Sequence, residues 1–388
     1  MNNKIKFVSV GDIMLGEETS VGFGIRSTSE KFGYDFPFRN ITSFLSQFDF
    51  VFGNLEVPLT DFYLDKRSLR SVRFRGSPLS APILKQNGFD ILSVANNHSL
   101  QFGKTGLNDC IEHLKKHNIK CVGLCNNKNR SIMETISIKD ITIGVIAYSL
   151  KKSEEFINES NTLSFIKNNT DIIIEDVKYY YQKVNHLFVS LHWGFEFVDH
   201  PSREQIKLAH SLIDVGARGV IGHHPHVLQA VERYNEGIIA YSLGNFIFDQ
   251  HFPSTLESMI LEIELNEKQI LDYKIHPVKV NKRFQPELAG EIDSKNILSK
   301  ISVLNKWLSN VDYDDRYDTN ECYKEELMEK AKFQKLQNIY FLRNIYKIKL
   351  RFIFTYILNK IKNLIHKRSY HFKYKAFKKG FFNYNEQF

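Results

Sequence analysis

The sequence predicts a layered α/β fold, because short buried strands alternate with helices along most of the chain. Runs of β-branched and aromatic residues end in polar turns that contain glycine or asparagine, as buried strands do. Eight such runs lie at 5–10, 48–52, 89–94, 120–124, 141–148, 186–191, 219–221 and 237–243. In a fold of this class, functional loops are expected at the carboxyl ends of the strands.

Helices are predicted between these strands at 104–117, 172–183 and 202–215. The third begins at Ser202, and Gln205 follows three residues later, as in a capping box. Two later runs, at 258–265 and 273–280, alternate apolar with polar residues. That alternation predicts antiparallel strands with one exposed face.

Beyond residue 281 the periodic signals weaken. Residues 311–320 (VDYDDRYDTN) are typical of an acidic loop or linker, and a long lysine-rich helical stretch begins near Tyr323. We therefore expect a main domain at 1–285, a connecting segment at 286–322 and a basic, helical C-terminal tail at 323–388.

The net charge of +8 belongs to this tail. Residues 330–388 hold 15 Lys or Arg and one acid, Glu386, whereas the preceding 329 residues hold 37 basic and 43 acidic side chains. Two interpretations stay open: the tail lies on an anionic lipid surface or in a partner complex, or it packs back on the acidic main domain. The charge-free run at 352–359 is too short to cross a bilayer. No base-reading motif is present, so a nucleic-acid partner is not expected.

The cysteines and the N-terminus bear on the compartment. Cys110, Cys121, Cys125 and Cys322 are too sparse for a disulfide scaffold and have no zinc-binding spacing, which indicates free thiols. The first residues run directly into the strand at 5–10, with neither a signal peptide nor a membrane-spanning segment. A cytoplasmic location, with peripheral membrane contact as an addition, is the expectation.

Polar side chains that bind metals follow five of the predicted strands. Because strand ends can meet at one edge of a sheet, these side chains are expected to surround one or two divalent ions. The mixed set of carboxylate, amide and imidazole groups suits Mn, Fe or Zn better than Ca or Mg. Two bridged ions can clamp a phosphoryl or acyl oxygen and lower the pKa of a bound water. The candidates are Asp12, Glu56, Asn97, His98, His192, His224 and His226.

Six motifs in order resemble the poly-γ-glutamate synthesis protein CapA family. They are GDIMLG (11–16), GNLEVPLT (53–60), FDILSVANNH (89–98), HWGFEF (192–197), GHHPHVLQ (222–229) and YSLGNFIFD (241–249). The family is a branch of the calcineurin-like metallophosphatase superfamily. The resemblance therefore implies a four-layer αββα sandwich of the metallo-dependent phosphatase type, here with a basic helical C-terminal extension.

The resemblance also implies roles for individual residues. Asp12, Glu56, Asn97, His192, His224 and His226 match metal ligands, with Glu56 in the bridging position, and His98 matches the catalytic histidine. Two positions depart from the general phosphatase pattern: Met14 stands where a histidine ligand is usual, and Glu56 is one methylene longer than the usual Asp. One metal position therefore lacks an imidazole, and its occupancy is open.

Several neighbours of the motifs are candidates for supporting roles, each with a structural alternative. Arg75, near Arg73, is a candidate for pairing with an anionic substrate, against the alternative of a surface arginine. Trp193 either stacks on a substrate or packs in the core. Asn245 and Asp249 either orient a ligand histidine or form a plain turn. His98 either protonates a leaving group or supports another residue. His223 is left out of the ligand set, since His224 and His226 share one side of the chain.

The sequence supports two candidate functions. The first is a CapA-like metal-dependent hydrolase or transferase that acts on a phosphate ester or on an amide of an anionic polymer in capsule or cell-envelope synthesis. The second, favoured by Met14, is a non-catalytic binding or assembly component of a capsule-polymer synthesis and export complex, docked by its basic tail.

Overall fold

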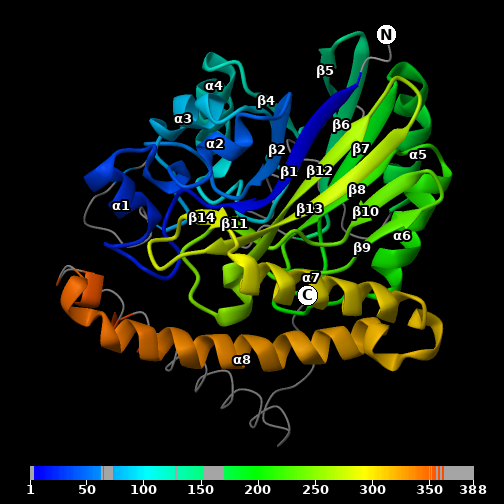
Figure 1. Ribbon diagram of the computed structural model, residues 1–388. Coiled ribbons are helices and arrows are strands. Elements are labelled where there is room, and N and C mark those ends of the chain that lie inside the picture. Colours follow the sequence, from blue (N-terminus) through cyan, green and yellow to red (C-terminus); the bar gives the residue numbers. More distant parts are fainter. Residues whose placement is uncertain are drawn as a thin grey trace, which may run out of the picture.

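Two β-sheets face each other in the computed structural model, and helices cover their outer faces (Figure 1). The structure describes residues 4–62, 64, 73–126, 130–151, 170–348, 350, 352–354, 357–358 and 361. This arrangement confirms the predicted αββα sandwich. Of the predicted basic tail, most of the part after residue 348 lies outside the described residues.

The first sheet has the order β14-β13-β12-β1-β2-β3-β4, with β11 paired to the end of β1. In one half of the sheet, β1, β2, β3 and β4 each run parallel to the next strand. In the other half, β12 pairs antiparallel with β1, and β13 and β14 follow in the same antiparallel way. The bounds are β1 (Ile5–Ile13), β2 (Phe50–Leu55), β3 (Phe89–Ser93), β4 (Lys120–Val122), β11 (Asn245–Ile247), β12 (Glu257–Leu265), β13 (Ile270–Val280) and β14 (Pro286–Leu288).

The second sheet has the order β5-β6-β7-β8-β10-β9. Strands β6, β7, β8 and β10 are parallel, and an antiparallel strand closes each edge. The bounds are β5 (Glu134–Ile138), β6 (Ile141–Ser149), β7 (His186–His192), β8 (Gly219–His223), β9 (Val231–Tyr234) and β10 (Gly237–Ala240).

The helices of the described residues flank the two sheets and continue into the C-terminal part. They are α1 (Ile25–Phe32), α2 (Thr42–Leu45), α3 (Ser80–Gln86), α4 (Gly103–Lys116), α5 (Asp171–Tyr180), α6 (Arg203–Asp214), α7 (Glu291–Leu308) and α8 (Thr319–Arg343). Short 3-10 helices lie at Phe36–Phe38, Tyr181–Lys183, Pro253–Leu256, Val311–Tyr313, Asp315–Tyr317 and Ile345–Lys347. No helix of the described chain combines the length and the apolar character needed to cross a bilayer.

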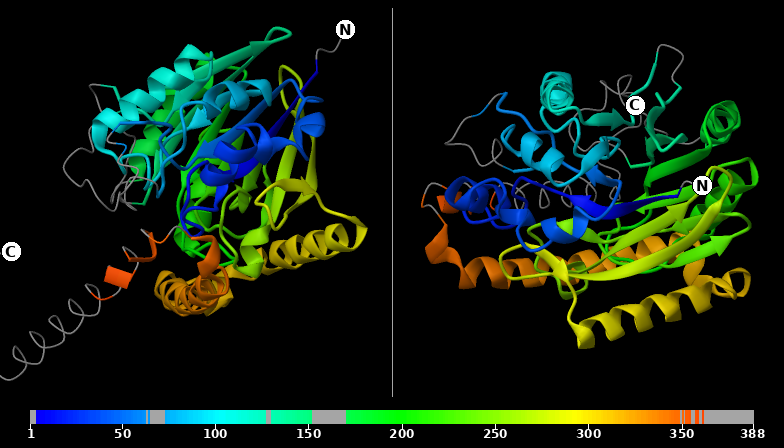
Figure 2. Two further views of the ribbon diagram at one scale, coloured as in Figure 1. Left: turned by 90° about the vertical axis from the view of Figure 1, so that its left-hand side faces the viewer. Right: turned by 45° about the horizontal axis from the view of Figure 1, so that its top comes forward.

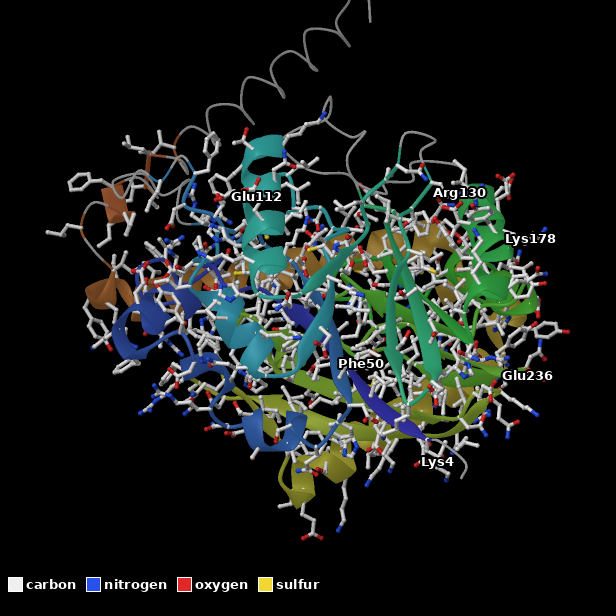
Figure 3. All side chains as sticks on the ribbon, turned by 90° about the horizontal axis from the view of Figure 1, so that it is seen from above. Lys4, Phe50, Glu112, Arg130, Lys178 and Glu236 are labelled. Carbon is white, nitrogen blue, oxygen red and sulfur yellow. The ribbon has the colours of Figure 1, made fainter. Side chains whose placement is uncertain are left out.

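Three apolar layers hold the sandwich together. The central layer joins the two sheets, with Phe50 of β2 and Phe188 of β7 both packed against Phe7 of β1. Figure 3 shows Phe50 in the interior, whereas Glu112, Lys178 and Glu236 lie at the periphery. The outer layers bury the apolar faces of α3 and α4 on one sheet and of α5 and α6 on the other. Apolar area removed from water is the main favourable term in such packing.

Local signals predicted the main elements closely. The capping box of α6 is present, with Ser202 and Gln205 each bonding to the backbone of the other.

The region after residue 281, where the periodic sequence signals are weak, is more structured than expected. It contains β14 and α7, whose Ile297 and Ile301 pack on the inter-sheet layer. Ile292 of α7 is 78 % exposed although it is apolar. An exposed apolar residue disturbs the helical spacing of the buried ones, so the sequence pattern of α7 was weak.

Helix α8 begins at Thr319, within the segment expected to be an acidic loop, and the preceding residues form two helical turns. It runs beneath the sandwich, across the loops that follow the strands (Figures 1 and 2). Phe333 of α8 stacks on Phe197 with 4.7 Å between ring centroids, and Tyr340 stacks on His251 at 3.4 Å. The helix therefore belongs to the packed body.

Candidate metal centre

The facing ends of strands from both sheets position the candidate ligands. Asp12 lies within β1, in register with Asn54 of β2 and Asn245 of β11. Glu56 follows β2 directly, and its backbone N–H bonds to the carbonyl of Ile13. His192 ends β7, where it is paired with His223 at the end of β8. The sandwich thus brings carboxylates from one sheet against imidazoles from the other.

Asp12, Glu56 and His226 form the first group that could hold a metal ion. One ligand atom of each lies within 4.8 Å of the others. Nδ1 of His226 is 3.4 Å from Oδ2 of Asp12, and its Nε2 is 3.7 Å from Oε1 of Glu56. All three side chains are buried. This group offers two carboxylates and one imidazole.

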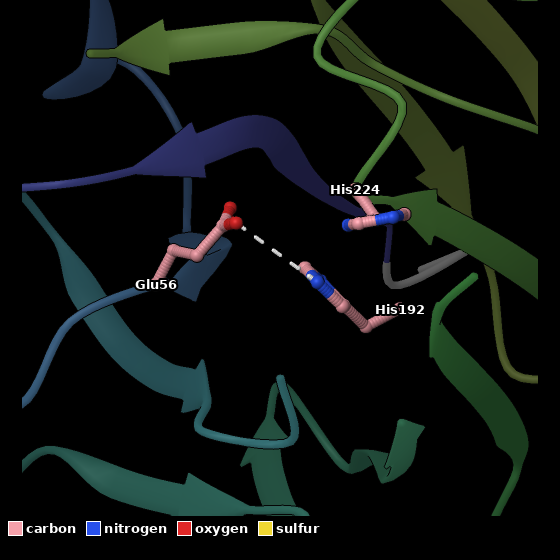
Figure 4. A group of neighbouring side chains, drawn as sticks. All are labelled: Glu56, His192 and His224. Atoms are coloured by element: carbon pink, nitrogen blue, oxygen red, sulfur yellow. Dashed lines mark ion pairs between the residues drawn. The ribbon is translucent and has the colours of Figure 1, made fainter. Parts of the chain in front are cut away.

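Glu56, His192 and His224 form the second group, again with ligand atoms within 4.8 Å of one another. In Figure 4 the Glu56 carboxylate and the His192 ring point toward each other, and Nε2 of His192 lies 3.9 Å from Oε1 of Glu56. The rings of His192 and His224 are 4.7 Å apart. Oδ1 of Asn97 lies 2.8 Å from Nε2 of His192. Glu56 belongs to both groups, so its carboxylate could contribute a ligand atom to either position.

The donor set fits divalent cations. Oε1 of Glu56 and both ring nitrogens of His224 are buried without a hydrogen-bond partner among the described residues. Buried polar atoms in native proteins nearly always have a partner, so these atoms point to an ion between them. Burial lowers the pKa of His192 and of His224 well below the ordinary value. Both rings are therefore neutral, which is the form that binds metals.

His98 lies beside the second ligand group, but it belongs to neither of the two groups. Its Nε2 is 3.1 Å from Nδ2 of Asn97, and its Nδ1 is 3.4 Å from Gln101. The ring stacks on Phe74 with centroids 4.0 Å apart. Burial lowers the pKa of His98 to about 3. The position permits contact with a substrate held at the second group, and its role as a general acid stays a prediction.

Two asparagines that the sequence analysis did not single out connect the ligands. Nδ2 of Asn54 donates to Oδ1 of Asp12 at 2.9 Å and lies 3.4 Å from Oε2 of Glu56. Asn96 donates to Oδ1 of Asn54 at 3.1 Å. Both lie inside motifs already recognised, GNLE and ANNH, one or two residues from a ligand. His223 also lies nearby, with Nδ1 3.2 Å from Oδ1 of Asp12.

Asn245 and Asp249, the two candidates for orienting a ligand histidine, make different contacts. Oδ1 of Asn245 lies 2.9 Å from Nδ1 of His226, the position of a partner that orients a ligand histidine. The carboxylate of Asp249 instead accepts hydrogen bonds from the backbone N–H groups of Glu18 and Ser20. Asp249 thereby holds the loop after β1 and contacts none of the candidate ligands.

Arg75 and Trp193 are both fully buried, and a direct contact of either side chain with a substrate stays a prediction. Arg75 donates to the backbone carbonyls of Thr60 and Phe62, and its guanidinium lies over the ring of Phe102, 4.1 Å from the centroid. Trp193 donates from Nε1 to the carbonyl of Tyr241 at 3.0 Å. In these contacts both side chains stabilise the packing of the folded chain.

Arg73 is better placed for an anion than Arg75. Its guanidinium lies 5.4 Å from the ring of Phe74, which in turn stacks on His98. Its Nε is buried with no hydrogen-bond partner among the described residues. An unpaired buried donor of this kind suits a phosphate or carboxylate oxygen.

The αββα sandwich is the fold of metallo-dependent phosphatases, and the carboxylates and imidazoles at its facing strand ends form a candidate metal centre. The chain belongs to the family described as "Bacterial capsule synthesis protein PGA_cap", whose sequence profile matches residues 6–250.

Curated relatives carry capsule names. The chain is 27 % identical over 311 residues to the capsule biosynthesis protein CapA of Bacillus anthracis, covering 78 % of this chain and 74 % of the relative. It is 28 % identical over 298 residues to the PGA biosynthesis protein CapA of Bacillus subtilis, covering 76 % of each.

Solved structures with a similar outline include a 5'-nucleotidase precursor from Thermus thermophilus, with 15 % identity, a TM-score of 0.45 and coverage of 80 % of this chain and 60 % of the other. The calcineurin-like phosphoesterase YfkN from Bacillus subtilis has 12 % identity and a TM-score of 0.42, covering 79 % of this chain and 99 % of the other.

Proposed function

We propose that this protein is a metal-dependent hydrolase or transferase in the synthesis of a bacterial capsule or envelope polymer, acting on a phosphate ester or on an amide of an anionic polymer. The observation that carries the proposal is the carboxylate of Glu56, which belongs to both ligand groups. The capsule names of the relatives support the biological setting.

The chain's own residues have distinct tasks in this proposal. Asp12, Glu56 and His226 would hold one ion, and Glu56, His192, His224 and Asn97 would hold the other. When bound, Mn, Fe or Zn ions supply an activated water and polarise the oxygen of the scissile group. Arg73 pairs with an anionic oxygen of the substrate. His98, beside Asn97, is the candidate proton donor to the leaving group, a role that requires the bound substrate to raise its pKa from about 3.

The two ion positions are unequal. Met14, which stands where a histidine ligand is usual, is fully buried, and its Sδ accepts from the backbone N–H of Gly16 at 3.2 Å. His226 is thus the single imidazole of the first group. We infer that this position binds its ion more weakly and that one or two ions are held per chain.

The test is elemental analysis of the purified protein, joined to hydrolysis of a generic phosphodiester and of a γ-glutamyl anilide. We expect His192→Ala and His224→Ala to lose bound metal and activity, since each removes an imidazole from the second group. His113→Ala is the control, because His113 lies on α4 and pairs with Asp109. Hydrolysis by the wild type that persists after chelation would contradict the proposal.

A second role, as an assembly component at the cytoplasmic membrane surface, is favoured by the outer face of α8. Leu327, Met328 and Leu342 are exposed there, and Lys324 and Lys335 lie on the same helix. Apolar and basic residues on one helix suit an anionic lipid surface. We expect the wild type to float with liposomes that contain an anionic lipid, and Leu327→Glu with Leu342→Glu to abolish flotation. Equal flotation of that variant would exclude this face.

A further inference from the structure

Helix α8 lies outside the segment that matches the family, yet it reaches the metal centre. The match ends at residue 250, and α8 spans Thr319–Arg343. Figures 1 and 2 show the helix crossing beneath the strand ends. Its contact nearest the centre is Glu326, whose Oε1 accepts a hydrogen bond from the backbone N–H of Glu196 at 3.0 Å. Glu196 lies in the loop after β7, four residues beyond His192.

Glu326 is a buried carboxylate, only 6 % exposed. A buried carboxylate is costly unless it is paired and hydrogen-bonded. Lys330, one turn later on α8, lies 3.2 Å from Oε1 of Glu326 and 3.3 Å from Oε1 of Glu196. Within the described residues, the hydrogen bond from Glu196 and the ion pair with Lys330 thus both use Oε1 of Glu326, which leaves Oε2 as a second acceptor.

His224 supplies the matching donor. Ligand-type atoms of Glu196, His224 and Glu326 all lie within 4.8 Å of one another. Both ring nitrogens of His224 are buried without a hydrogen-bond partner among the described residues. Because the two nitrogens of an imidazole point in different directions, only one of them is used toward Glu56 and His192. Metal-binding histidines almost always donate the other ring N–H to an acceptor such as a carboxylate.

We propose that Glu326 is a positioning residue that accepts a hydrogen bond from His224 and so fixes the tautomer and orientation of this metal ligand. Helix α8 is thereby a structural part of the metal centre. The inference rests on the proposed metal site and names a residue that the family match does not include. Lys330 lies between the carboxylates of Glu196 and Glu326 and offsets part of their negative charge.

Other contacts hold α8 in place without Glu326. Phe333 packs against Phe197 and Phe252, and Glu325 lies 3.0 Å from Nε2 of His200. A substitution at Glu326 therefore changes the chemistry beside His224 while the helix remains docked. Glutamine is the sharpest choice, because its carbonyl still accepts from Glu196 and its amide presents donors where His224 requires an acceptor.

The experiment compares wild type, Glu326→Gln and the control Glu321→Gln, whose side chain pairs with Lys324 on the same helix. Zn²⁺ and Co²⁺ affinities are measured by competition with a chromophoric chelator, and the visible absorption of the Co²⁺ protein reports ligand geometry. We expect Glu326→Gln to bind about 10 to 100 times more weakly and to change the Co²⁺ spectrum, with unchanged metal stoichiometry. Glu321→Gln should match the wild type, and both variants should melt together with the wild type in EDTA.

The outcomes separate the two proposals. Wild-type protein that binds neither ion would overturn the proposed function and this inference together. Metal binding by the wild type with the same affinity and spectrum in Glu326→Gln would overturn the inference alone. A loss of one ion per chain in Glu326→Gln would also overturn it, since Glu326 would then be a ligand.

Discussion

Glu56 is the residue on which both candidate ion positions depend. Burial, reinforced by the nearby charge of Asp12, raises its pKa well above the ordinary value. A carboxylate in such a place is stable in its charged form only beside cations. Although burial opposes it, the charges of Glu56 and Asp12 raise the pKa of His226 to about 10, so this ring supplies one positive charge, and bound metal ions would add more. The cost of keeping Glu56 buried is thus offset when metal ions bind, which couples metal binding to the stability of the fold.

Trp193 illustrates how strand geometry separates neighbouring residues. It directly follows His192 in the chain, and consecutive side chains of a strand face opposite sides. His192 accordingly faces the metal centre while Trp193 enters the layer between the second sheet and its helices. The alternation of side chains along a strand would therefore have predicted, from the sequence, that Trp193 packs in the core.

We expect Trp193→Phe to lower the free energy of unfolding by about 1–3 kcal/mol, because the buried carbonyl of Tyr241 loses its donor. Metal affinity should stay within about twofold of the wild type. Urea unfolding and chelator competition measure the two quantities. A rise in KM with unchanged stability would instead restore Trp193 as a substrate contact.

At the scale of elements, the strand ends approach each other too closely for side chains at certain glycines. A Cβ on Gly11 would lie 2.0 Å from the carbonyl oxygen of Gly244, and one on Gly222 would lie 1.9 Å from that of Tyr241. Gly11 precedes Asp12 and Gly222 precedes the histidine run. The glycines of both motifs therefore allow the backbone contacts that bring ligand-bearing strands together.

Gly222→Ala should destabilise the protein by about 2–3 kcal/mol, since β8 and the chain at Tyr241 must move apart. Weaker metal binding should accompany this loss, as His224 moves with β8. The matched control is Gly290→Ala, where a Cβ has nothing within 4 Å. Urea unfolding with and without Zn²⁺ measures both effects, and equal stability of the two variants would contradict the steric argument.

Sequence reasoning predicted the elements and ligands that have strong local signals. Asp12, Glu56 and His192 could be chosen as candidates because each lies at or directly after the end of a buried strand, within a recognisable motif. The direction of Arg75 could not be predicted, because it is decided by contacts with Thr60, Phe62 and Phe102 that no local pattern records. The approach of Glu326 to His224 joins segments far apart in the chain and required the three-dimensional fold.

At the scale of the whole molecule, buried acids tie stability to pH. Burial raises the pKa of Glu17 to about 7, and burial with the charge of Asp249 raises that of Glu18 to about 7. The folded chain thus keeps protons that the unfolded chain releases near the ordinary value of 4.5. The contribution of these groups is fully present below that value and is lost as the pH rises toward 7.

Glu18→Gln should therefore stabilise the protein at pH 8 and leave its stability near pH 5 almost unchanged. The gain is about 1 kcal/mol after allowance for the partial exposure of Glu18. Glutamine can still accept the hydrogen bond from Gln250, which is 3.0 Å long. Urea unfolding at both pH values in EDTA is the measurement, with the highly exposed Glu291→Gln as control. A variant no more stable than the wild type at pH 8 would refute the assignment.

The placement of ligands on both sheets also bears on the order of folding. Asp12 and Glu56 come early in the chain, while His192 ends β7 and His224 and His226 follow β8 of the second sheet. Contacts between such distant segments carry a large loop-closure cost and form late. A chain emerging from the ribosome therefore completes the candidate metal centre only when β8 has joined β7, so that metal uptake at this site would follow folding and act mainly by slowing unfolding.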